Sequence, residues 1–308
     1  MRSFFDGTTF YDAWTDGRIV VSGDNQQDVE TQRVRLTSVF DFNSDVKTDR
    51  TIFRPSAGSW YTSLVGGSSS STGWGVSTDI DVAADYDGDA ITDIAVFRPG
   101  TGQWFILQSS DGGIRIDAWG VNGDTPVPGD VDGDGKADLG IFRSSAGAWY
   151  IKKSTGGSST TAWGVSGDVP MLNDYDNDGK ADITIYRNGI WYILYSSGGS
   201  LTQAWGTTGD IPVGGDYDGD GKADLAIFRP GIGWWYILRS SNGTTLAVPW
   251  GISGDTPVSG DQDGDGLADY MIFRDSSGVW YTQYAAGGAT AAAWGTTGDN
   301  PVGRRPGS

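Results

Sequence analysis

Residues 130–143 read Asp-Val-Asp-Gly-Asp-Gly-Lys-Ala-Asp-Leu-Gly-Ile-Phe-Arg, and this stretch decides the fold because it recurs along the chain. Its first half places aspartates at alternate positions with glycines between them, which is a turn composition. Its second half is a short apolar run. The copies begin 42 to 45 residues apart, at Asp41, Asp85, Asp130, Asp174, Asp216 and Asp261. A period of about 44 residues is typical of a repeat protein.

Each copy continues with the same further elements. The apolar run ends in Phe-Arg or Tyr-Arg, and a turn separates it from Trp-Tyr or Trp-Phe, as at Trp235. Trp-Gly comes about fourteen residues later, and most copies close with Gly-Asp-x-Pro-Val. In the fifth copy, residues 225–229 and 235–239 are short, β-rich and bounded by turn residues, so they predict an antiparallel hairpin. Residues 244–250 and 257–259 predict a third and a short fourth strand.

Both faces of the first two strands carry apolar residues, so each sheet must be covered on both sides. A β-propeller supplies this cover, because every four-stranded blade lies between two neighbours. We therefore predict an all-β, seven-bladed β-propeller of about 44-residue repeats that occupies residues 1–308 as a single domain. Six repeats would fill residues 41–303. Residues 1–40 would be a degenerate blade that closes the ring with the C-terminal strand.

Two alternatives to this architecture stay open. Seven periods of about 44 residues account for the length of 308, but only six complete units stand between Asp41 and Gly303. A ring of six blades with an N-terminal extension is therefore the second hypothesis. An open β-solenoid or a bead-like array would also explain a regular repeat.

Composition limits the chemistry. The chain has no cysteine and no histidine, which excludes disulfides, thiol nucleophiles, Ser-His-Asp triads and the usual zinc sites. Its formal net charge is -18, which argues against a nucleic-acid partner and favours cations. The sequence has no run of about 18 apolar residues, so we expect no membrane insertion.

The Asp loops have the spacing of an oxygen-ligand metal site. In residues 130–138, carboxylates occupy positions 1, 3, 5 and 9, a sharp turn falls at Gly135, and the carbonyl of Lys136 lies at position 7. Calcium prefers six to eight oxygen ligands at flexible geometry, whereas magnesium prefers a smaller, well-hydrated site. Position 12, where an EF-hand carries a bidentate glutamate, is Ile141. These loops therefore predict calcium sites that are not EF-hands.

Five to six structural Ca2+ sites follow from this pattern. The second copy has Ala90 in place of the turn glycine, and we still expect it to bind. The first copy loses one carboxylate, at Asn43, and both glycines, so we expect it to be the weakest site. The predicted ligands are Asp41, Asn43, Asp45 and Asp49; Asp85, Asp87, Asp89, Ile91 and Asp93; Asp130, Asp132, Asp134, Lys136 and Asp138; Asp174, Asp176, Asp178, Lys180 and Asp182; Asp216, Asp218, Asp220, Lys222 and Asp224; and Asp261, Asp263, Asp265, Leu267 and Asp269.

The predicted role of this calcium is structural. Six filled sites would add twelve positive charges and move the net charge from -18 to -6. Calcium at tenfold its dissociation constant stabilises each independent site by ~1.4 kcal/mol, or ~8 kcal/mol for six sites. That is comparable to the whole stability of a domain. Chelation should therefore loosen or melt the fold.

The run Asp-x-Asp-Gly-Asp-Gly-x-x-Asp followed by an apolar strand resembles the FG-GAP (VCBS-type) repeat of integrin α-like propellers. The bacterial surface-protein variant is the most similar form, with Phe-Arg-Pro, Trp-Tyr and Trp-Gly-x-x-Gly-Asp-x-Pro-Val in each unit. The resemblance covers residues 41–303 well and 1–40 poorly. It implies extracellular proteins with seven-bladed propellers, calcium in inter-strand loops, and roles in adhesion or recognition. The Phe-Gly and Gly-Ala-Pro elements of the eukaryotic form are absent, so no integrin ligand residue carries over.

The repeated tryptophans and arginines have simpler interpretations than ligand binding. An aromatic residue at a fixed register in every blade fills the core between blades. Trp234 lies outside the pattern, so it is the better candidate for an exposed contact. We expect the six repeated arginines to pair with nearby aspartates, the candidates being Asp124, Asp168, Asp210, Asp255 and Asp299.

We therefore predict a non-catalytic, calcium-stabilised adhesion, recognition or scaffold module at a bacterial cell surface. Its partner would be a protein or a polysaccharide, and many weak sites suit the millimolar calcium found outside cells. The absence of cysteine fits a bacterial exterior. A carbohydrate-binding lectin and a self-assembling filament subunit are the alternatives. An enzyme is disfavoured, because nearly all carboxylates belong to the predicted metal loops.

Overall fold

The computed structural model describes residues 2–5, 10–13, 19–22 and 40–304. The chain divides into two units, residues 1–36 and residues 37–308. The first unit contains one antiparallel sheet in the order β1 (Arg2–Phe5), β2 (Phe10–Ala13) and β3 (Ile19–Ser22). The remaining residues of the predicted degenerate blade at 1–40, apart from Phe40, lie outside the described part of the chain.

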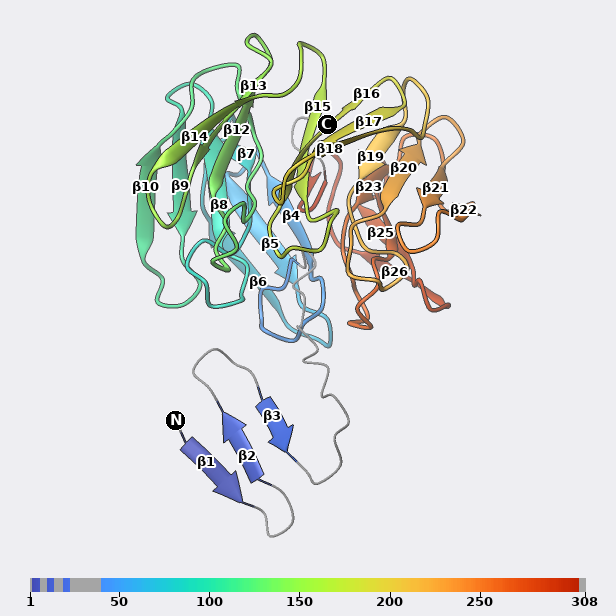
Figure 1. The fold of residues 1–308 in the computed structure, drawn as a ribbon. Coiled ribbons are helices and arrows are strands. Elements are labelled where there is room, and N and C mark those ends of the chain that lie inside the picture. Colours follow the sequence, from blue (N-terminus) through green and yellow to red (C-terminus); the bar gives the residue numbers. More distant parts are fainter. Residues whose placement is uncertain (1, 6–9, 14–18, 23–39, 305–308) are drawn as a thin grey trace. The chain divides into compact units, whose positions relative to one another are not determined.

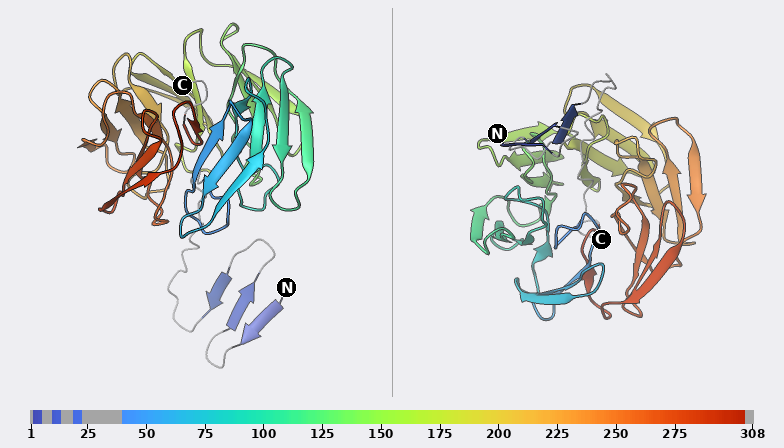
Figure 2. Two further views of the ribbon diagram at one scale, coloured as in Figure 1. Left: turned by 180° about the vertical axis from the view of Figure 1, so that it is seen from behind. Right: turned by 90° about the horizontal axis from the view of Figure 1, so that it is seen from below.

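The second unit is a β-propeller of six four-stranded antiparallel blades (Figures 1 and 2). The short strand of each blade is given first. Blades 1 to 3 are β27 (Asn300–Pro301), β4 (Arg50–Arg54), β5 (Ser59–Ser63) and β6 (Ser69–Gly73); β7 (Ile80–Asp81), β8 (Ile94–Arg98), β9 (Gln103–Leu107) and β10 (Ile114–Ala118); and β11 (Thr125–Pro126), β12 (Leu139–Arg143), β13 (Ala148–Lys152) and β14 (Ser158–Ala162).

Blades 4 to 6 repeat this order of four strands. They are β15 (Val169–Asn173), β16 (Asp182–Arg187), β17 (Ile190–Leu194) and β18 (Ser200–Ala204); β19 (Ile211–Val213), β20 (Leu225–Arg229), β21 (Trp234–Leu238) and β22 (Thr245–Val248); and β23 (Thr256–Val258), β24 (Tyr270–Arg274), β25 (Val279–Gln283) and β26 (Ala289–Ala293). None of the elements in the described residues is a helix able to span a membrane.

The prediction of seven blades is wrong, and the alternative of six blades is correct. The C-terminal strand β27 pairs with β4, with Asn300 opposite Phe53 and Pro301 opposite Ile52. The first repeat has no Gly-Asp-x-Pro-Val strand of its own, and residues 298–302 supply it. The two ends of the second unit therefore complete one blade between them, and the predicted blade made from residues 1–40 is not required for closure.

Indole hydrogen bonds join the blades into a closed ring. The second tryptophan of each blade donates from Nε1 to a main-chain carbonyl of the next blade, as Trp74 does to Phe105 at 3.0 Å. Four further bonds of this kind continue around the ring. The last runs from Trp294 in blade 6 to the carbonyl of Tyr61 in blade 1, at 3.2 Å. The sixth blade thus contacts the first.

The core lies between the blades, as apolar residues on both strand faces require. In β8, the side chains of Ala95, Val96 and Phe97 are all fully buried. The first tryptophan of every blade is at most 1 % exposed, and in blade 2 the Trp104 ring lies 5.5 Å from Phe97 between centroids. This confirms that the repeated first tryptophans pack the core. They are Trp60, Trp104, Trp149, Trp191, Trp235 and Trp280.

One repeated glycine is required by a close approach of two turns. Gly102 has φ +65°, and a Cβ there would stand 2.1 Å from the carbonyl oxygen of Gly120. The turn between the second and third strands of a blade therefore rests directly on the Trp-Gly turn that follows the fourth strand. A side chain at this position would force the two turns apart.

Candidate metal centres in the Asp loops

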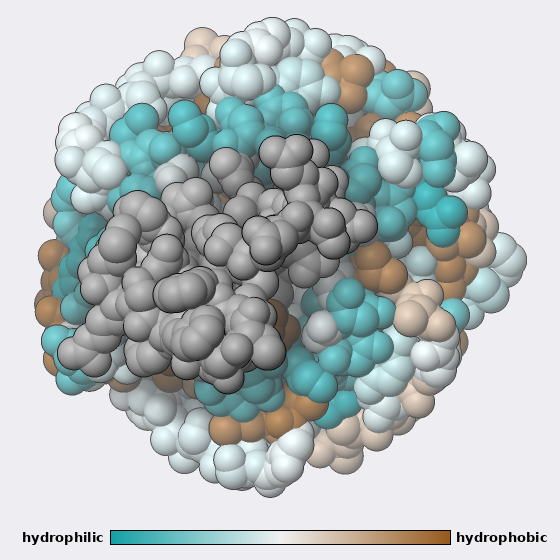
Figure 3. All heavy atoms as spheres, turned by 60° about the horizontal axis from the view of Figure 1, so that its bottom comes forward, coloured by the Kyte–Doolittle hydropathy of each residue, from teal (hydrophilic) through white to brown (hydrophobic). Residues whose placement is uncertain are grey.

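In blades 2 to 6 the Asp loop joins the short first strand to the second strand, and in blade 1 the loop at residues 41–49 leads directly into β4, so the architecture places all six loops at one end of the ring. Figure 3 shows one face of the molecule, on which strongly hydrophilic side chains lie beside scattered hydrophobic ones. The loop of blade 3, for example, connects β11 to β12. The repeat therefore becomes a set of equivalent acidic loops arranged around one axis.

The aspartate at position 1 organises the loop by accepting main-chain hydrogen bonds. In blade 3, Asp130 Oδ1 accepts from the N–H of Gly133 at 2.6 Å, and its Oδ2 accepts from Gly135 at 2.8 Å. Gly135 has φ +85°, which glycine adopts without strain. Ala90 occupies the same position in blade 2 at φ +67° and still donates to Asp85 Oδ2, at 2.8 Å. The second loop therefore keeps the wrapped conformation without its glycine.

The aspartate at position 9 is the most deeply buried carboxylate of each loop. Asp138 is 1 % exposed; its Oδ2 accepts from the N–H of Val131, and its Oδ1 from Ser154 in the turn between the third and fourth strands. Asp224 makes the equivalent bonds to Tyr217 and Ser240. Position 9 thus ties the metal loop to the outer part of its own blade.

Burial raises the pKa of these position 9 carboxylates, and main-chain N–H donors only partly oppose it. The pKa of Asp93 and of Asp224 rises to about 6, and that of Asp269 rises to about 7. Desolvation is the largest cause in each case, and neighbouring loop carboxylates add repulsion. Ionisation of these carboxylates is therefore less favourable in the folded loops than in the unfolded chain, and a bound cation would compensate the charge.

Five of the six loops bring three carboxylates together, with one oxygen from each lying within 4.8 Å of the others. In blades 2 to 5 these are positions 1, 3 and 9, and in blade 6 they are positions 1, 3 and 5. The five clusters are Asp85, Asp87 and Asp93; Asp130, Asp132 and Asp138; Asp174, Asp176 and Asp182; Asp216, Asp218 and Asp224; and Asp261, Asp263 and Asp265. These five clusters could hold metal ions.

The first loop differs from the other five. Among the described residues, Asp41, Asp45 and Asp49 form no such cluster. Instead, the Asn43 side chain donates to Asp45 Oδ2 at 3.1 Å, which satisfies one carboxylate within the loop. Asp49 keeps the position 9 contacts, accepting from the N–H groups of Phe42 and Val65.

The predicted ligands at positions 5 and 7 make hydrogen bonds within the protein. The residue at position 7 donates its own N–H to the position 5 carboxylate, as Lys136 does to Asp134 at 2.9 Å. The same bond is made at Lys47, Ile91, Lys180, Lys222 and Leu267. In blades 2 to 5 the position 5 carboxylates also accept a serine hydroxyl, and these carboxylates are Asp89, Asp134, Asp178 and Asp220.

The sequence reasoning missed those hydroxyl residues. In blade 3, Ser154 Oγ donates to Asp134 Oδ2 at 2.7 Å, and Thr155 Oγ1 donates to Asp132 Oδ2 at 2.5 Å. The signal was present, because a hydroxyl pair follows the third strand of blades 2 to 5. The pairs are Ser109 and Ser110, Ser154 and Thr155, Ser196 and Ser197, and Ser240 and Ser241.

The donor set fits a hard cation. Carboxylate oxygens are the ligands that calcium prefers. Asp132 Oδ1 and Asp176 Oδ1 are buried and, within the described part of the chain, accept no hydrogen bond. A buried carboxylate oxygen without a partner is costly, and a bound cation would satisfy it. Positions 1, 3 and 9 in blades 2 to 5, and positions 1, 3 and 5 in blade 6, are therefore the residues that would hold calcium.

The loops also join the blades to one another. The N–H of Ala137 donates to the carbonyl of Asp85, the first residue of the preceding loop, at 2.6 Å. Equivalent bonds of 2.6 to 2.7 Å link all six loops, and Thr48 closes the circle by donating to Asp261. The residue that begins each candidate metal site thus also contacts the next blade.

Ion pairs occupy the opposite end of the blades. Arg143 forms two hydrogen bonds of 2.8 Å with the buried carboxylate of Asp124, and its guanidinium lies 4.5 Å above the Tyr150 ring. The predicted pairing of the repeated arginines is confirmed, and Asp79 is an additional partner. The pairs are Arg54 with Asp299, Arg98 with Asp79, Arg143 with Asp124, Arg187 with Asp168, Arg229 with Asp210 and Arg274 with Asp255.

Trp234 is the exposed tryptophan that the repeat pattern singled out. It is 37 % exposed and stacks on Tyr236 at 6.3 Å between ring centroids. Ile232 and Ile252 nearby are each 51 % exposed. The prediction that Trp234 contacts a partner is not tested by this geometry.

Comparison with known proteins supports the repeat assignment. Residues 216–272 match the FG-GAP-like repeat family, and no curated protein matches the chain. One similar solved structure is an Agrocybe aegerita lectin that recognises non-reducing terminal N-acetylglucosamine, with 19% identity, a TM-score of 0.53, and coverage of 82% of this chain and 78% of the lectin. Another is an inactive virginiamycin B lyase from Staphylococcus aureus with quinupristin, with 10% identity, a TM-score of 0.52 and coverage of 81% of both chains. At these identities the likeness shows the propeller fold alone. Residues 216–272 thus match an FG-GAP-like repeat, and the same loop and strand pattern recurs in the six blades of the β-propeller.

Proposed function

We propose that the chain is a non-catalytic, calcium-stabilised recognition or scaffold module at a bacterial cell surface. One observation carries this proposal: the loops that gather carboxylates are the same loops that hydrogen-bond blade to blade around the ring. A cation that fixes one loop therefore also fixes the contact with the next blade. Calcium would act on the ring as a whole rather than on a reacting group.

Electrostatics gives the cation its effect. Two like charges 4 Å apart repel by about 4 kcal/mol at an effective dielectric constant of about 20. Each of the five clusters holds three carboxylate oxygens within 4.8 Å of one another. A divalent ion replaces this repulsion with attraction. Sites made by one surface loop suit the millimolar calcium outside cells better than the trace calcium inside them, which supports an extracellular location.

The disposition of the carboxylates supports a role without catalysis. A glycosidase needs two carboxylates across an open cleft, one of them with a raised pKa. Here the aspartates with raised pKa values lie at position 9 or position 1 of the loops, where they are hydrogen-bonded to loop N–H groups, or are paired with arginine, as Asp81 is with Arg304. The other repeated set, represented by Asp124, is paired with arginine. Recognition of a protein or a polysaccharide is therefore the proposed activity, and self-association into filaments is its alternative.

Calcium stoichiometry and location test this proposal. Flow dialysis with radioactive calcium should find five sites per chain, with magnesium as a weak competitor. Asp132→Asn, in blade 3, should remove one site, whereas Asp45→Asn, in the first loop that has no carboxylate cluster, should remove none. No calcium binding at millimolar concentration, or equal losses in both variants, would contradict the assignment. Surface biotinylation of the native host cells should label the protein without lysis.

A further inference from the structure

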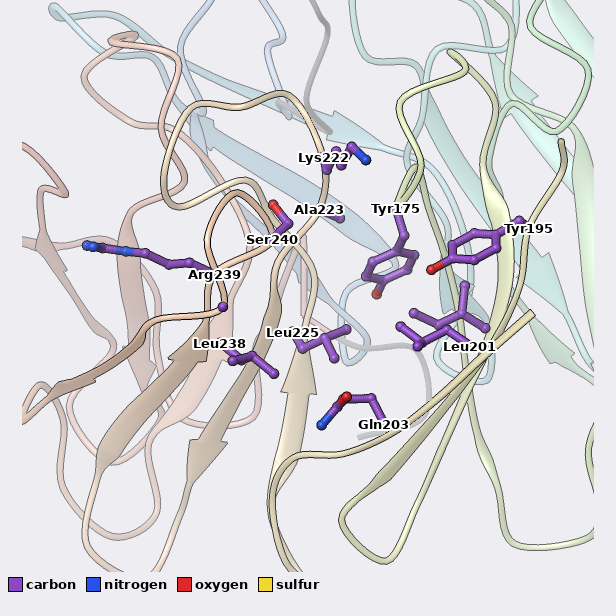
Figure 4. Close-up of a pocket in the computed structure, with 12 residues that line it drawn as sticks. Tyr175, Tyr195, Leu201, Gln203, Lys222, Ala223, Leu225, Leu238, Arg239 and Ser240 are labelled. Carbon is purple, nitrogen blue, oxygen red and sulfur yellow. The ribbon is translucent and has the colours of Figure 1, made fainter. Parts of the chain in front are cut away.

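A cavity of about 410 Å³ lies between blades 4 and 5, next to the Asp loops of these blades, which contribute Tyr175, Lys222 and Ala223 to its lining (Figure 4). Its apolar wall is made by Ile193, Leu201, Leu225 and Leu238. Its polar groups include the Tyr175 and Tyr195 phenols and the Gln203 carboxamide. This volume is in the range of small-molecule sites in proteins, and a mainly apolar wall with a few converging polar groups is their usual composition.

The Tyr175 phenol points to a polar ligand. Tyr175 is 6 % exposed, and its hydroxyl forms no hydrogen bond with any residue that the structure describes. Figure 4 shows this hydroxyl and that of Tyr195 directed into the cavity from one side. An unpaired buried hydroxyl costs about 1–3 kcal/mol, which a ligand oxygen would recover.

The side chains that form the cavity are replaced by different residues at the equivalent interface between blades 2 and 3. Repeat alignment matches Leu201, Gln203 and Leu238 with Arg115, Asp117 and Lys152. In blades 2 and 3 these three residues form an ion-paired cluster, in which Asp117 accepts from Arg115 at 2.5 Å and from Lys152 at 2.6 Å. The same chain therefore contains a polar, mutually satisfied version of the site and an open version.

We propose that the cavity between blades 4 and 5 binds one ring of a neutral saccharide. Phenol and carboxamide groups both donate and accept hydrogen bonds, as sugar hydroxyls do. The leucine side chains suit the apolar C–H face of a sugar ring. Lys222 also lines the cavity and the Arg239 guanidinium extends away from it (Figure 4), while the net charge of -18 disfavours an anionic ligand. This inference rests on the recognition role proposed above and specifies its ligand class.

The test uses methyl-labelled leucine in the full chain with calcium present. Methyl glucoside, methyl galactoside, methyl mannoside and methyl N-acetylglucosaminide are titrated separately, with methyl glucuronide as the anionic comparator. At least one neutral glycoside should shift the Leu201, Leu225 and Leu238 methyl signals saturably, with a dissociation constant of about 1 mM. The glucuronide should bind more weakly than its neutral counterpart.

Two variants and one matched control locate the binding. Tyr175→Phe should weaken binding about tenfold, because it removes one hydrogen bond. Tyr217→Phe is the control, since Tyr217 holds the same loop position in blade 5, is equally buried and lacks a hydroxyl partner, but packs on Tyr270 outside the cavity. A triple variant, Leu201→Arg, Gln203→Asp and Leu238→Lys, copies the blade 2–3 cluster and should abolish binding.

Several results would overturn the saccharide site. These are no methyl shift with any neutral glycoside at millimolar concentration, equal weakening by both Phe variants, or undiminished binding by the triple variant. Calcium stoichiometry is measured on the same samples. If five calcium ions bind while no glycoside does, the cavity assignment fails and the calcium-stabilised module stands. If a glycoside binds but no calcium does, the cavity assignment stands and the calcium-stabilised module fails.

Discussion

Removal of calcium should invert the usual effect of pH on the stability of an acidic protein. Burial raises the pKa of the position 9 carboxylates Asp49, Asp93, Asp182 and Asp224 from 3.8 to about 6. Between these two values the folded protein without metal holds protons that the unfolded chain has already released. Raising the pH from about 4 to about 7 therefore destabilises the folded state.

The size of this effect follows from the shift. A shift of about two pKa units corresponds to about 3 kcal/mol for one fully buried carboxylate. In a domain of this size, 1 kcal/mol moves the melting temperature by about 2–4 °C. Several position 9 carboxylates contribute to this effect. We take the contribution of one carboxylate as the lower limit of the change in stability. About half of this effect, about 1.4 kcal/mol for one group, lies above pH 5, so the melting temperature in chelator should fall by at least about 3 °C between about pH 5 and about pH 8.

Differential scanning calorimetry in chelator measures this slope directly. With saturating calcium the slope should disappear or reverse, because the metal binds the deprotonated carboxylates. Asp269→Asn removes the group whose pKa is raised to about 7 and should flatten the slope near neutral pH. A melting temperature that rises with pH across this range in chelator would refute the reasoning.

Three substitutions probe the ring by thermal unfolding. Arg304→Ala leaves the buried Asp81 carboxylate without its 2.8 Å ion pair, and should cost about 3–5 kcal/mol; a loss under about 1 kcal/mol would show that Asp81 is solvated. Trp294→Phe removes the indole bond to the Tyr61 carbonyl that closes blade 6 on blade 1, and should cost about 1–2 kcal/mol; an unchanged melting temperature would contradict the role of this bond. Asp132→Asn should lower the stabilisation by calcium and leave the chelated protein's melting temperature unchanged or raised; a drop in chelator would mean that the carboxylate is structural without metal.

The repeated residues alone were enough to predict the strands of one blade. The hairpins, the short first strand and the tryptophan core all follow from apolar periodicity and turn composition. The number of blades did not follow from dividing the length by the period. Each blade needs one Gly-Asp-x-Pro-Val strand, and residues 298–302 supply the strand that the first repeat lacks. Counting this element together with its two variants, residues 78–82 in blade 2 and 167–171 in blade 4, rather than total length, would have indicated six blades.

The candidate sites were only partly predictable. Alternating aspartates indicated the loop, and the structure brings positions 1, 3 and 9 together in blades 2 to 5. The hydroxyls of Ser154 and Thr155 were missed, because they lie about twenty residues from the loop and reach it only after the third strand returns. The cavity between blades 4 and 5 was also beyond sequence reasoning, since it depends on which side chains face each other across two repeats.

The central claim is that calcium holds the six-bladed ring together, and paired melting experiments in calcium and in chelator test it most directly. Five sites at tenfold their dissociation constant would add about 7 kcal/mol, or roughly 15 °C or more in melting temperature. Magnesium at equal ionic strength should restore little of this. A melting temperature that is the same in calcium and in chelator would contradict the account.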